Sequence, residues 1–293
     1  MNEFLTPKQV ARALQVSESS VKRWCDKEII PTQYTAGGHR RIALSELIDF
    51  LRSSKHELIR PEVIGLPATT GQTIRVIDRA ALQFTEALLG GDEEQCRQIV
   101  LDLYLAEHSI SAICDLVFAK AFATIGDRWK CGDAEVYQER RGCELALRVL
   151  HELRTLIPAP ARDAPLAIGG AAEGDQYSLA TTMVELVLRD IKWNAVSMGA
   201  NLPFETLAAA ICQHQPKMFW LSVSHIKDET QFIHSYSKLY DEFGADVAFV
   251  VGGRALHEQI RQQIQYAAFC DNIRHLESFA QTLLSATGKQ SPT

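Results

Sequence analysis

The sequence predicts a multidomain protein of α and α/β class, with a small helical head, a four-helix bundle and a doubly wound parallel sheet of five strands. Three observations predict it. Proline and glycine break the chain near residues 57–72 and 158–165. Between these breaks, apolar residues recur at helical spacing. Beyond them, short apolar runs alternate with helical stretches, as in consecutive βα units.

Charge is divided unevenly along the 293 residues. Overall, 30 Lys and Arg side chains stand against 36 Asp and Glu, which gives a formal net charge of −6. Residues 1–60 nevertheless hold ten basic and seven acidic side chains, so the acidic excess belongs to the rest of the chain. A basic head on an acidic body indicates that only the head meets phosphate, because the body repels a polyanion.

Cysteine usage and hydropathy indicate the compartment. The seven cysteines are scattered and include no Cys-x-x-Cys pair, which argues against a disulfide framework or a zinc knuckle. No apolar run approaches the ~18 residues of a spanning helix, and the first residues lack the apolar stretch of a signal peptide. We expect a cytoplasmic protein with reduced thiols and no membrane partner.

The head is expected to begin with two short helices joined by a turn. Thr6 and Gln9 form a capping box around Pro7, and Ser17 can cap the second helix. This arrangement is typical of a helix-turn-helix. Away from its apolar face, the second helix carries two hydroxyls and two cations: Ser19, Ser20, Lys22 and Arg23.

A hairpin and a closing helix complete the head. Gly37 and Gly38 permit a tight turn. Polar and cationic side chains flank it: Tyr34, His39, Arg40 and Arg41. Apolar residues at 44, 47, 48 and 51 have the spacing of an amphipathic helix. We therefore predict a winged helix-turn-helix domain over residues 1–56, followed by a linker over 57–72.

The rest of the chain divides into a bundle and a sheet. Residues 73–158 contain almost no helix breakers and predict about four helices. Residues 165–289 predict a flavodoxin-like, doubly wound parallel sheet, in which ligands bind at the carboxyl ends of the strands. Its five strands are expected at 166–171, 194–198, 218–223, 247–251 and 267–270. The Gly-rich motifs that bind dinucleotides or nucleoside triphosphates are missing, which disfavours those ligands.

Two stretches of the head, 21–26 and 35–42, together with Pro31, resemble the winged helix-turn-helix of MerR-family transcription regulators. The resemblance implies that the second helix enters the major groove of DNA and that the hairpin, as a wing, grips the flanking backbone. Lys and Arg supply phosphate contacts, and hydroxyls at a helix N-terminus can reach phosphates or base edges. The alternative is a solvated basic face. The linker replaces the long helix of many such regulators, which favours repression by occupancy over promoter untwisting.

Trp129 and Glu139 in the bundle, with the strand-end loops 198–203, 222–224 and 252–254, resemble the cobalamin-binding module of methionine synthase. The order of the three parts resembles CarH-type light-sensing repressors. The resemblance implies that the loops surround a corrin ring and its nucleotide tail. The loop residues that we assign to this candidate pocket are Ser222, Ser224, Gly252 and Gly253.

The metal-ligand positions depart from that pattern. The family's cobalt-ligating motif is Asp-x-His-x-x-Gly, and here Asp175, Tyr177 and Ala180 stand at its fixed positions. A phenol with a pKa of about 10 donates a lone pair poorly compared with neutral imidazole. Arg140 follows Glu139 where the light-sensing relatives carry histidine, and a guanidinium cannot ligate a metal. We therefore expect no cofactor; the alternative is adenosylcobalamin, or another chromophore, held by contacts to the ring and tail.

Other roles for these side chains stay open. Glu139, Arg140, Asp175 and Tyr177 form either a polar pocket for a different ligand or a structural network that seals the bundle onto the sheet. Trp129 either stacks on a planar ligand or belongs to the core.

The sequence as a whole predicts a cytoplasmic, nucleoid-associated transcription regulator that represses by binding a double-stranded DNA operator. A head of net charge +3 makes few phosphate contacts, so we expect a homo-oligomer that places two heads on repeated half-sites. The body would sense a signal or oligomerise, and an antirepressor protein is a further partner to consider. We expect no enzyme, because no hydrolase constellation stands out and the motif histidine of corrinoid methyl transfer is missing.

Overall fold

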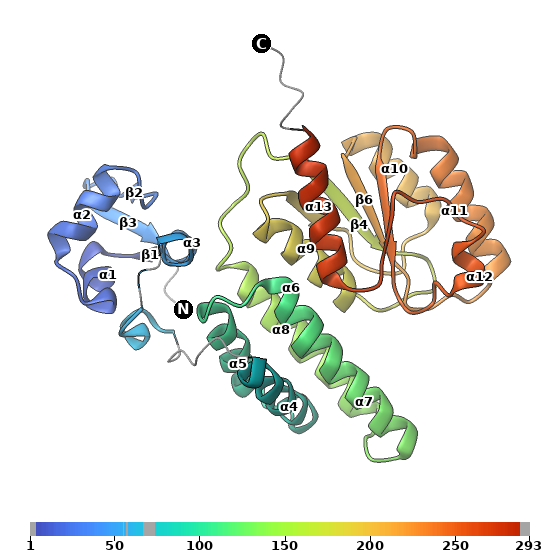
Figure 1. The fold of residues 1–293 in the computed structure, drawn as a ribbon, viewed down its shortest axis with the longest axis horizontal. Coiled ribbons are helices and arrows are strands. Elements are labelled where there is room, and N and C mark those ends of the chain that lie inside the picture. The colour runs from blue at the N-terminus through green and yellow to red at the C-terminus, as the bar shows by residue number, and fades with distance from the viewer. Residues whose placement is uncertain (1–3, 55, 57, 67–73, 288–293) are drawn as a thin grey trace, which may run out of the picture. The chain divides into compact units, whose positions relative to one another are not determined.

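The computed structural model describes residues 4–54, 56, 58–66 and 74–287, and it divides the chain into two compact units, 1–158 and 159–293 (Figure 1). Parts of the predicted boundaries fall outside the described residues, namely 1–3, 55, 57, 67–73 and 288–289. The predicted domain bounds therefore stay predictions at those points.

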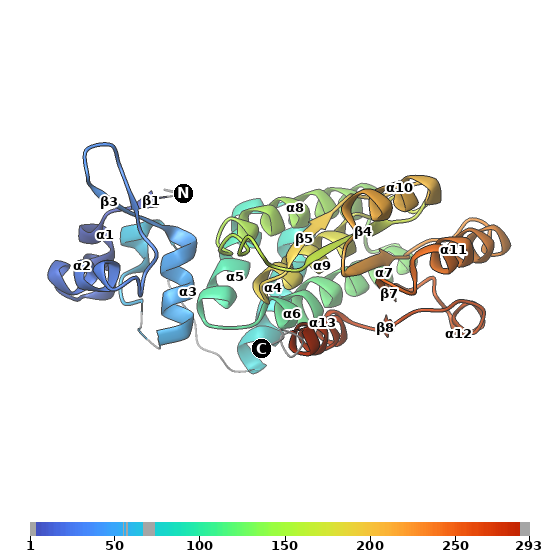
Figure 2. The same cartoon turned by 90° about the horizontal axis from the view of Figure 1, so that it is seen from above.

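The head contains three helices and a small antiparallel sheet of strand order β1-β3-β2. Its elements are β1 (Phe4–Leu5), α1 (Pro7–Leu14), α2 (Glu18–Asp26), β2 (Gln33–Tyr34), β3 (Arg40–Ala43) and α3 (Leu44–Ser54). The predicted capping box is present: the Gln9 backbone N–H donates to Thr6 Oγ1 at 3.3 Å, and the Thr6 N–H donates to Gln9 Oε1 at 2.9 Å. Seen from above, the β2–β3 hairpin extends beyond the helices of the head (Figure 2).

Part of the predicted linker is folded onto the head. Pro61–Ile64 forms a 3-10 helix, η1, and both end residues of this turn are buried. The backbone N–H groups of Ile59 and Arg60 donate to the carbonyl of Ala13 at 3.1 and 2.9 Å. Pro61 and Gly65 belong to the pattern that predicted a linker, but they begin and end this turn. Gly65 ends it with a φ of 79°, the left-handed conformation that glycine favours. A single turn is too short to show periodicity.

The predicted bundle consists of four helical segments. Its elements are α4 (Ile74–Gly90), α5 (Glu93–Leu105), α6 (Ile110–Ile113) running through the π-helical η2 (Cys114–Ala119) into α7 (Lys120–Cys131), and α8 (Val136–Arg154). Its core includes Phe84 and Phe118, whose ring centroids lie 4.7 Å apart. Burial raises the pKa of the Cys96 thiol to about 12, which keeps this buried cysteine protonated.

The second unit is the predicted doubly wound sheet. Its strands are β4 (Leu166–Ala171), β5 (Asn194–Ser197), β6 (Met218–Ser222), β7 (Ala248–Gly252) and β8 (Ala268–Cys270). They pair in parallel in the order β5-β4-β6-β7-β8, which confirms the flavodoxin-like order. The connecting helices are α9 (Leu179–Asp190), α10 (Phe204–His214), α11 (Glu229–Phe243), α12 (Glu258–Arg261) and α13 (Ile273–Thr287).

The sheet separates two hydrophobic cores. On the side of α9 and α13, the core includes Val184, Trp193, Trp220 and Leu276. On the side of α10, α11 and α12, it includes Phe219. The two helix layers are visible on either side of β4 and β6 in Figure 1. Because successive residues of a strand point to opposite faces, residues 218 and 220 of β6 lie in one core while 219 and 221 lie in the other.

Within the described ranges, none of the helices combines the length and apolar content that crossing a bilayer requires.

Candidate functional site

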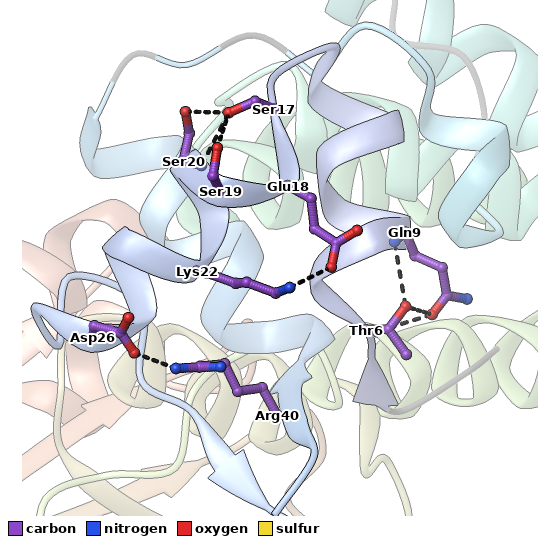
Figure 3. Close-up of polar contacts among 9 residues, drawn as sticks. All are labelled: Thr6, Gln9, Ser17, Glu18, Ser19, Ser20, Lys22, Asp26 and Arg40. Carbon is purple, nitrogen blue, oxygen red and sulfur yellow. Dashed lines mark hydrogen bonds and ion pairs between the residues drawn. The ribbon is translucent and has the colours of Figure 1, made fainter.

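Three serines gather at the start of α2. The Ser17 hydroxyl accepts from the backbone N–H of Ser20 at 3.1 Å and lies 2.8 Å from the hydroxyls of both Ser19 and Ser20 (Figure 3). The N-terminus of α2 is thus capped by the chain itself. Ser19 is exposed and Ser20 half-exposed, so both hydroxyls stand where an incoming phosphate or base edge can reach them.

Two cations of the head pair with carboxylates of α2. Lys22 Nζ lies 2.8 Å from Glu18 Oε1, and Arg40 Nη2 lies 2.6 Å from Asp26 Oδ1 (Figure 3). The hydrogen bond and charge of Lys22 hold the pKa of Glu18 below its ordinary value. The hydrogen bond with Asp26 raises the pKa of Arg40. Solvent reaches both pairs, and exposed pairs of this kind are held weakly, so a phosphate can take the place of either carboxylate.

The hairpin turn is closed by its own hydrogen bonds. The Thr35 N–H donates to the His39 carbonyl at 2.9 Å, and the His39 N–H donates to Thr35 Oγ1 at 3.1 Å. Gly38 has a φ of 76°, a conformation that glycine adopts without steric cost. On the strands, Tyr34 stands opposite Arg40, whose guanidinium lies 5.8 Å from the centre of the tyrosine ring.

These elements line one groove of about 450 Å³ in the head. Its lining residues are Thr6, Pro7, Lys8, Glu18, Lys22, Gly38, His39, Arg40 and Arg41. The groove therefore brings together five of the predicted DNA-binding residues and adds Lys8, which sequence reasoning missed. The sequence signal that could have indicated Lys8 is its position as a cation in the first turn of a capped helix. The predicted residues that do not line this groove are Ser19, Ser20, Arg23, Tyr34 and Gly37.

In the α/β unit, Asp175 is fully buried and joins two strand-end loops. Its Oδ1 accepts from the N–H of Tyr177 at 3.0 Å. Its Oδ2 accepts from the N–H of Ser224 and, at 3.3 Å, from that of His225. The loop after β4 is thereby tied to the loop after β6. Both carboxylate oxygens of Asp175 are thus engaged by backbone N–H groups of its own unit. The two interpretations of Asp175, a polar pocket and a network that seals the bundle onto the sheet, both stay predictions.

Tyr177 lies half-buried beside an arginine. The guanidinium of Arg254 stands 5.6 Å from the centre of the Tyr177 ring, and Arg254 Nε donates to the Ser224 carbonyl at 3.3 Å. The phenol at the position of the family's cobalt ligand therefore packs against a permanent cation. A positive charge at this place disfavours binding of a metal ion nearby, because like charges repel.

The two glycines at the end of β7 have structural reasons of their own. A Cβ added to Gly252 would lie 2.7 Å from the Cys270 carbonyl oxygen, and one added to Gly253 would lie 2.3 Å from that of Val223. Both glycines are therefore required by close backbone packing. Ser222 is buried at the end of β6, and Ser224 is half-exposed in the following loop.

The predicted pocket residues of the bundle lie at the surface of the first unit. Trp129, near the end of α7, is 54% exposed, so its interpretation as a core residue is wrong. Glu139 and Arg140 are neighbours on α8, with Arg140 Nε 3.8 Å from Glu139 Oε2. These three residues and those of the strand-end loops belong to different units, and a pocket shared between them stays a prediction.

Two families of known domains match parts of the first unit. Residues 4–55 match the family of the helix-turn-helix domain. Residues 81–154 match the family of the B12 binding domain. The chain joins a helix-turn-helix domain to a B12-binding module. A search of the curated proteins returned no match.

One solved structure shares the fold of most of this chain. The monomethylamine corrinoid protein of Methanosarcina barkeri is 16% identical, with a TM-score of 0.60 over 71% of this chain and 98% of its own. A cobalamin-binding protein from Desulfitobacterium hafniense DCB-2 is 16% identical over 71% of this chain and 98% of its own, with a TM-score of 0.38. The methanol:cobalamin methyltransferase complex MtaBC of Methanosarcina barkeri is 16% identical over 80% of this chain and 92% of its own, with a TM-score of 0.39. At 16% identity, the likeness to the monomethylamine corrinoid protein establishes the fold alone.

The two family matches indicate a class of partner and a class of ligand. The helix-turn-helix domain suggests DNA binding, and the B12-binding module suggests a cobalamin-related sensor. Cobalamin is accordingly a plausible ligand, and the expectation of no cofactor gains no support from these matches. Among the residues that the structure describes, no group of three or more His, Cys, Asp or Glu side chains is placed to hold a metal ion.

Proposed function

We propose that this protein is a transcription regulator that binds an operator in double-stranded DNA through its head and represses by occupying it. The groove of the head carries the proposal. It collects Lys8 from α1, Lys22 from α2, and His39, Arg40 and Arg41 from the hairpin. Cations from three elements on one surface are what a phosphate backbone requires.

The elements of the head suggest how DNA would be held. The start of α2, with Ser19, Ser20 and Arg23, would enter the major groove, while the hairpin would act as the wing on the flanking backbone. On binding, Lys22 and Arg40 would exchange their carboxylate partners for phosphate oxygens. Because each head offers few phosphate contacts, we propose that a homo-oligomer places two heads on repeated half-sites.

A titration with DNA tests this proposal. Duplexes selected by the wild-type protein from a randomised pool would be titrated by fluorescence anisotropy, together with a random duplex. We expect Arg40→Ala to weaken binding to both duplexes about tenfold, since a phosphate contact carries no sequence information. Arg128→Ala is the matched control, because Arg128 pairs with a carboxylate, Glu86, at 2.5 Å in the bundle. Equal losses in the two variants would contradict the assignment of the hairpin.

The body is proposed to regulate rather than catalyse. We propose that it works without cobalt ligation from residue 177 and no longer depends on cobalamin, because a phenol packed against Arg254 replaces imidazole. The signal would then be another ligand or a protein, such as an antirepressor that docks on the body. In this role the protein acts in the cytoplasm, on the DNA of the nucleoid.

A second candidate is a repressor that responds to adenosylcobalamin and light. The match of residues 81–154 to the B12 binding domain favours it, as does the exposed Trp129 on that segment. The two candidates separate in an absorbance titration with adenosylcobalamin in the dark, followed by size exclusion read at protein and corrin wavelengths. Co-elution of corrin with protein supports the second candidate, and separation at high cobalamin supports the loss of cobalamin dependence.

A further inference from the structure

Trp220, in the middle of β6, is held in place on the α9 side of the sheet. Only 2% of its surface is exposed, although it is one of the largest side chains. Its indole Nε1 donates to Thr181 Oγ1, on α9, at 2.8 Å. The Thr181 hydroxyl also lies 3.1 Å from that of Ser197, at the end of β5. The indole is therefore fixed by both packing and hydrogen bonding, and it connects β6 to α9.

The neighbouring strand makes room for this ring. Gly169 of β4 is the register partner of Trp220. A Cβ added to Gly169 would lie 2.2 Å from Trp220 Cδ2 and 2.4 Å from Cγ. No side chain other than hydrogen fits at that distance, so the indole lies directly against the backbone of β4. The glycine and the tryptophan form a matched pair across the neighbouring strands β4 and β6.

The position of the indole relative to the strand ends is decisive. Trp220 and Ser222 point to the same side of β6, because side chains alternate along a strand. Thr181 follows Ala180 directly in α9. The resemblance to the cobalamin-binding module implies that the motif glycine, which is Ala180 here, admits the nucleotide tail, and that the loops that begin at Ser222 and Gly252 surround the corrin ring and this tail. The indole therefore fills the space between β6 and α9 next to these positions, two residues before Ser222 along β6.

We propose that Trp220 closes the slot for the nucleotide tail, so that this body excludes a corrinoid whose tail is inserted between the sheet and α9. The base of that tail is a planar bicyclic aromatic of about the size of an indole, and the two cannot share the space. Opening the slot would expose a buried ring and leave Thr181, itself fully buried, without the indole N–H. A corrin ring without a tail, or a smaller ligand at the strand ends, meets no such obstacle.

Binding of two corrinoids to the full chain tests the proposal. Cobalamin carries the nucleotide tail and cobinamide lacks it. Dissociation constants for both would be measured by equilibrium dialysis, with the wild-type protein and with Trp220→Gly. We expect the wild-type protein to bind cobalamin no more tightly than cobinamide. We expect Trp220→Gly to bind cobalamin about tenfold more tightly than cobinamide, because the opened slot admits the tail.

Trp193→Gly is the matched control. Trp193 is fully buried in the same core but precedes β5, at the opposite end of the strands from Ser222. Its removal leaves a cavity of similar size without opening the slot, so no preference for cobalamin should appear. Trp220→Leu, which fills more of the core, serves if the glycine variant does not fold.

Two results would overturn the proposal. One is a wild-type protein that prefers cobalamin over cobinamide about tenfold or more, since its tail would then be accommodated beside Trp220. The other is a folded Trp220 variant with no preference for cobalamin. The inference concerns the α/β unit alone, and DNA titrations of the same variants report separately on the function proposed for the head.

Discussion

In the head, Lys22 and Arg40 lie at the surface, and each pairs with a carboxylate that solvent also reaches. In the α/β unit, Asp175 and Trp220 are buried, and their hydrogen bonds join different elements of the fold. Exposed ion pairs can be exchanged for a phosphate at little cost, whereas buried bonds cannot be opened without leaving donors or acceptors unsatisfied. The cations of the head can therefore change partners at little cost, whereas the buried hydrogen bonds of the strand-end region cannot be replaced so easily.

The largest expected effect is on the α/β unit. Asp175→Ala should destabilise it by about 3 kcal/mol, because up to three backbone N–H groups lose a buried carboxylate acceptor. Amide hydrogen exchange at residues 224 and 225 would measure the local loss, and urea unfolding the global one. Asp228→Ala is the control, since Asp228 caps α11 at an exposed site, by accepting from the Gln231 N–H at 3.0 Å. If both variants lost the same stability, Asp175 would not join the loops as described.

The next largest effect is expected for Lys8, the cation of the groove that the sequence analysis did not predict. Lys8→Ala should weaken DNA binding several-fold on all duplexes and lower the slope of log affinity against log salt by about one. Anisotropy titrations at four salt concentrations would measure both quantities. Lys130→Ala, at an exposed site in the bundle, should leave the slope unchanged. An unchanged slope for Lys8→Ala would remove Lys8 from the interface.

A smaller effect of opposite sign should come from the carboxylate in the same groove. Glu18→Gln releases Lys22 and removes a negative charge that faces the phosphates, so DNA affinity should rise about threefold. Asp26→Asn should act in the same direction, because it releases Arg40. The same anisotropy assay measures both variants. A loss of affinity in either would mean that the carboxylate positions the cation for DNA.

The pH dependence of the Glu18–Lys22 pair follows from the lowered pKa of Glu18. A carboxyl whose pKa is depressed in the folded state stabilises that state above its unfolded pKa, ordinarily 4.5, and loses this contribution as pH falls through the lowered value. The difference in thermal unfolding between wild type and Glu18→Gln should therefore be constant above pH 4.5 and vanish at more acidic pH. A difference that persists after Glu18 is protonated would contradict the ion pair as its source.

The smallest effect is expected in the bundle. Glu86→Gln removes the partner of Arg128 from an exposed pair, so the cost in stability should be below about 1 kcal/mol, and DNA affinity should not change. Urea unfolding and the same titrations would check this. A large change in DNA affinity would show that the bundle, and not the head alone, meets DNA.

Local signals in the sequence predicted much of the fold. The capping box at Thr6, the cap at Ser17 and the glycine turn at Gly38 placed the elements of the head, since each acts over a few residues. Five apolar runs separated by helical stretches were enough to predict the parallel sheet. The π-helical turn of η2 and the 3-10 turn at Pro61–Ile64 could not be predicted, because neither has a periodicity of its own.

The sequence by itself determined the order of the domains, the type of each element and the residue types that could meet DNA or a ligand. Only the tertiary structure decided which of them act together. Lys8 reaches the groove of the hairpin, Asp175 reaches the loop after β6, and Trp220 lies against Gly169, each across a long separation in the chain. Caps and periodicity are local properties, whereas cross-strand register and burial arise only when distant segments pack, so no local pattern could reveal that an indole fills the space beside β4.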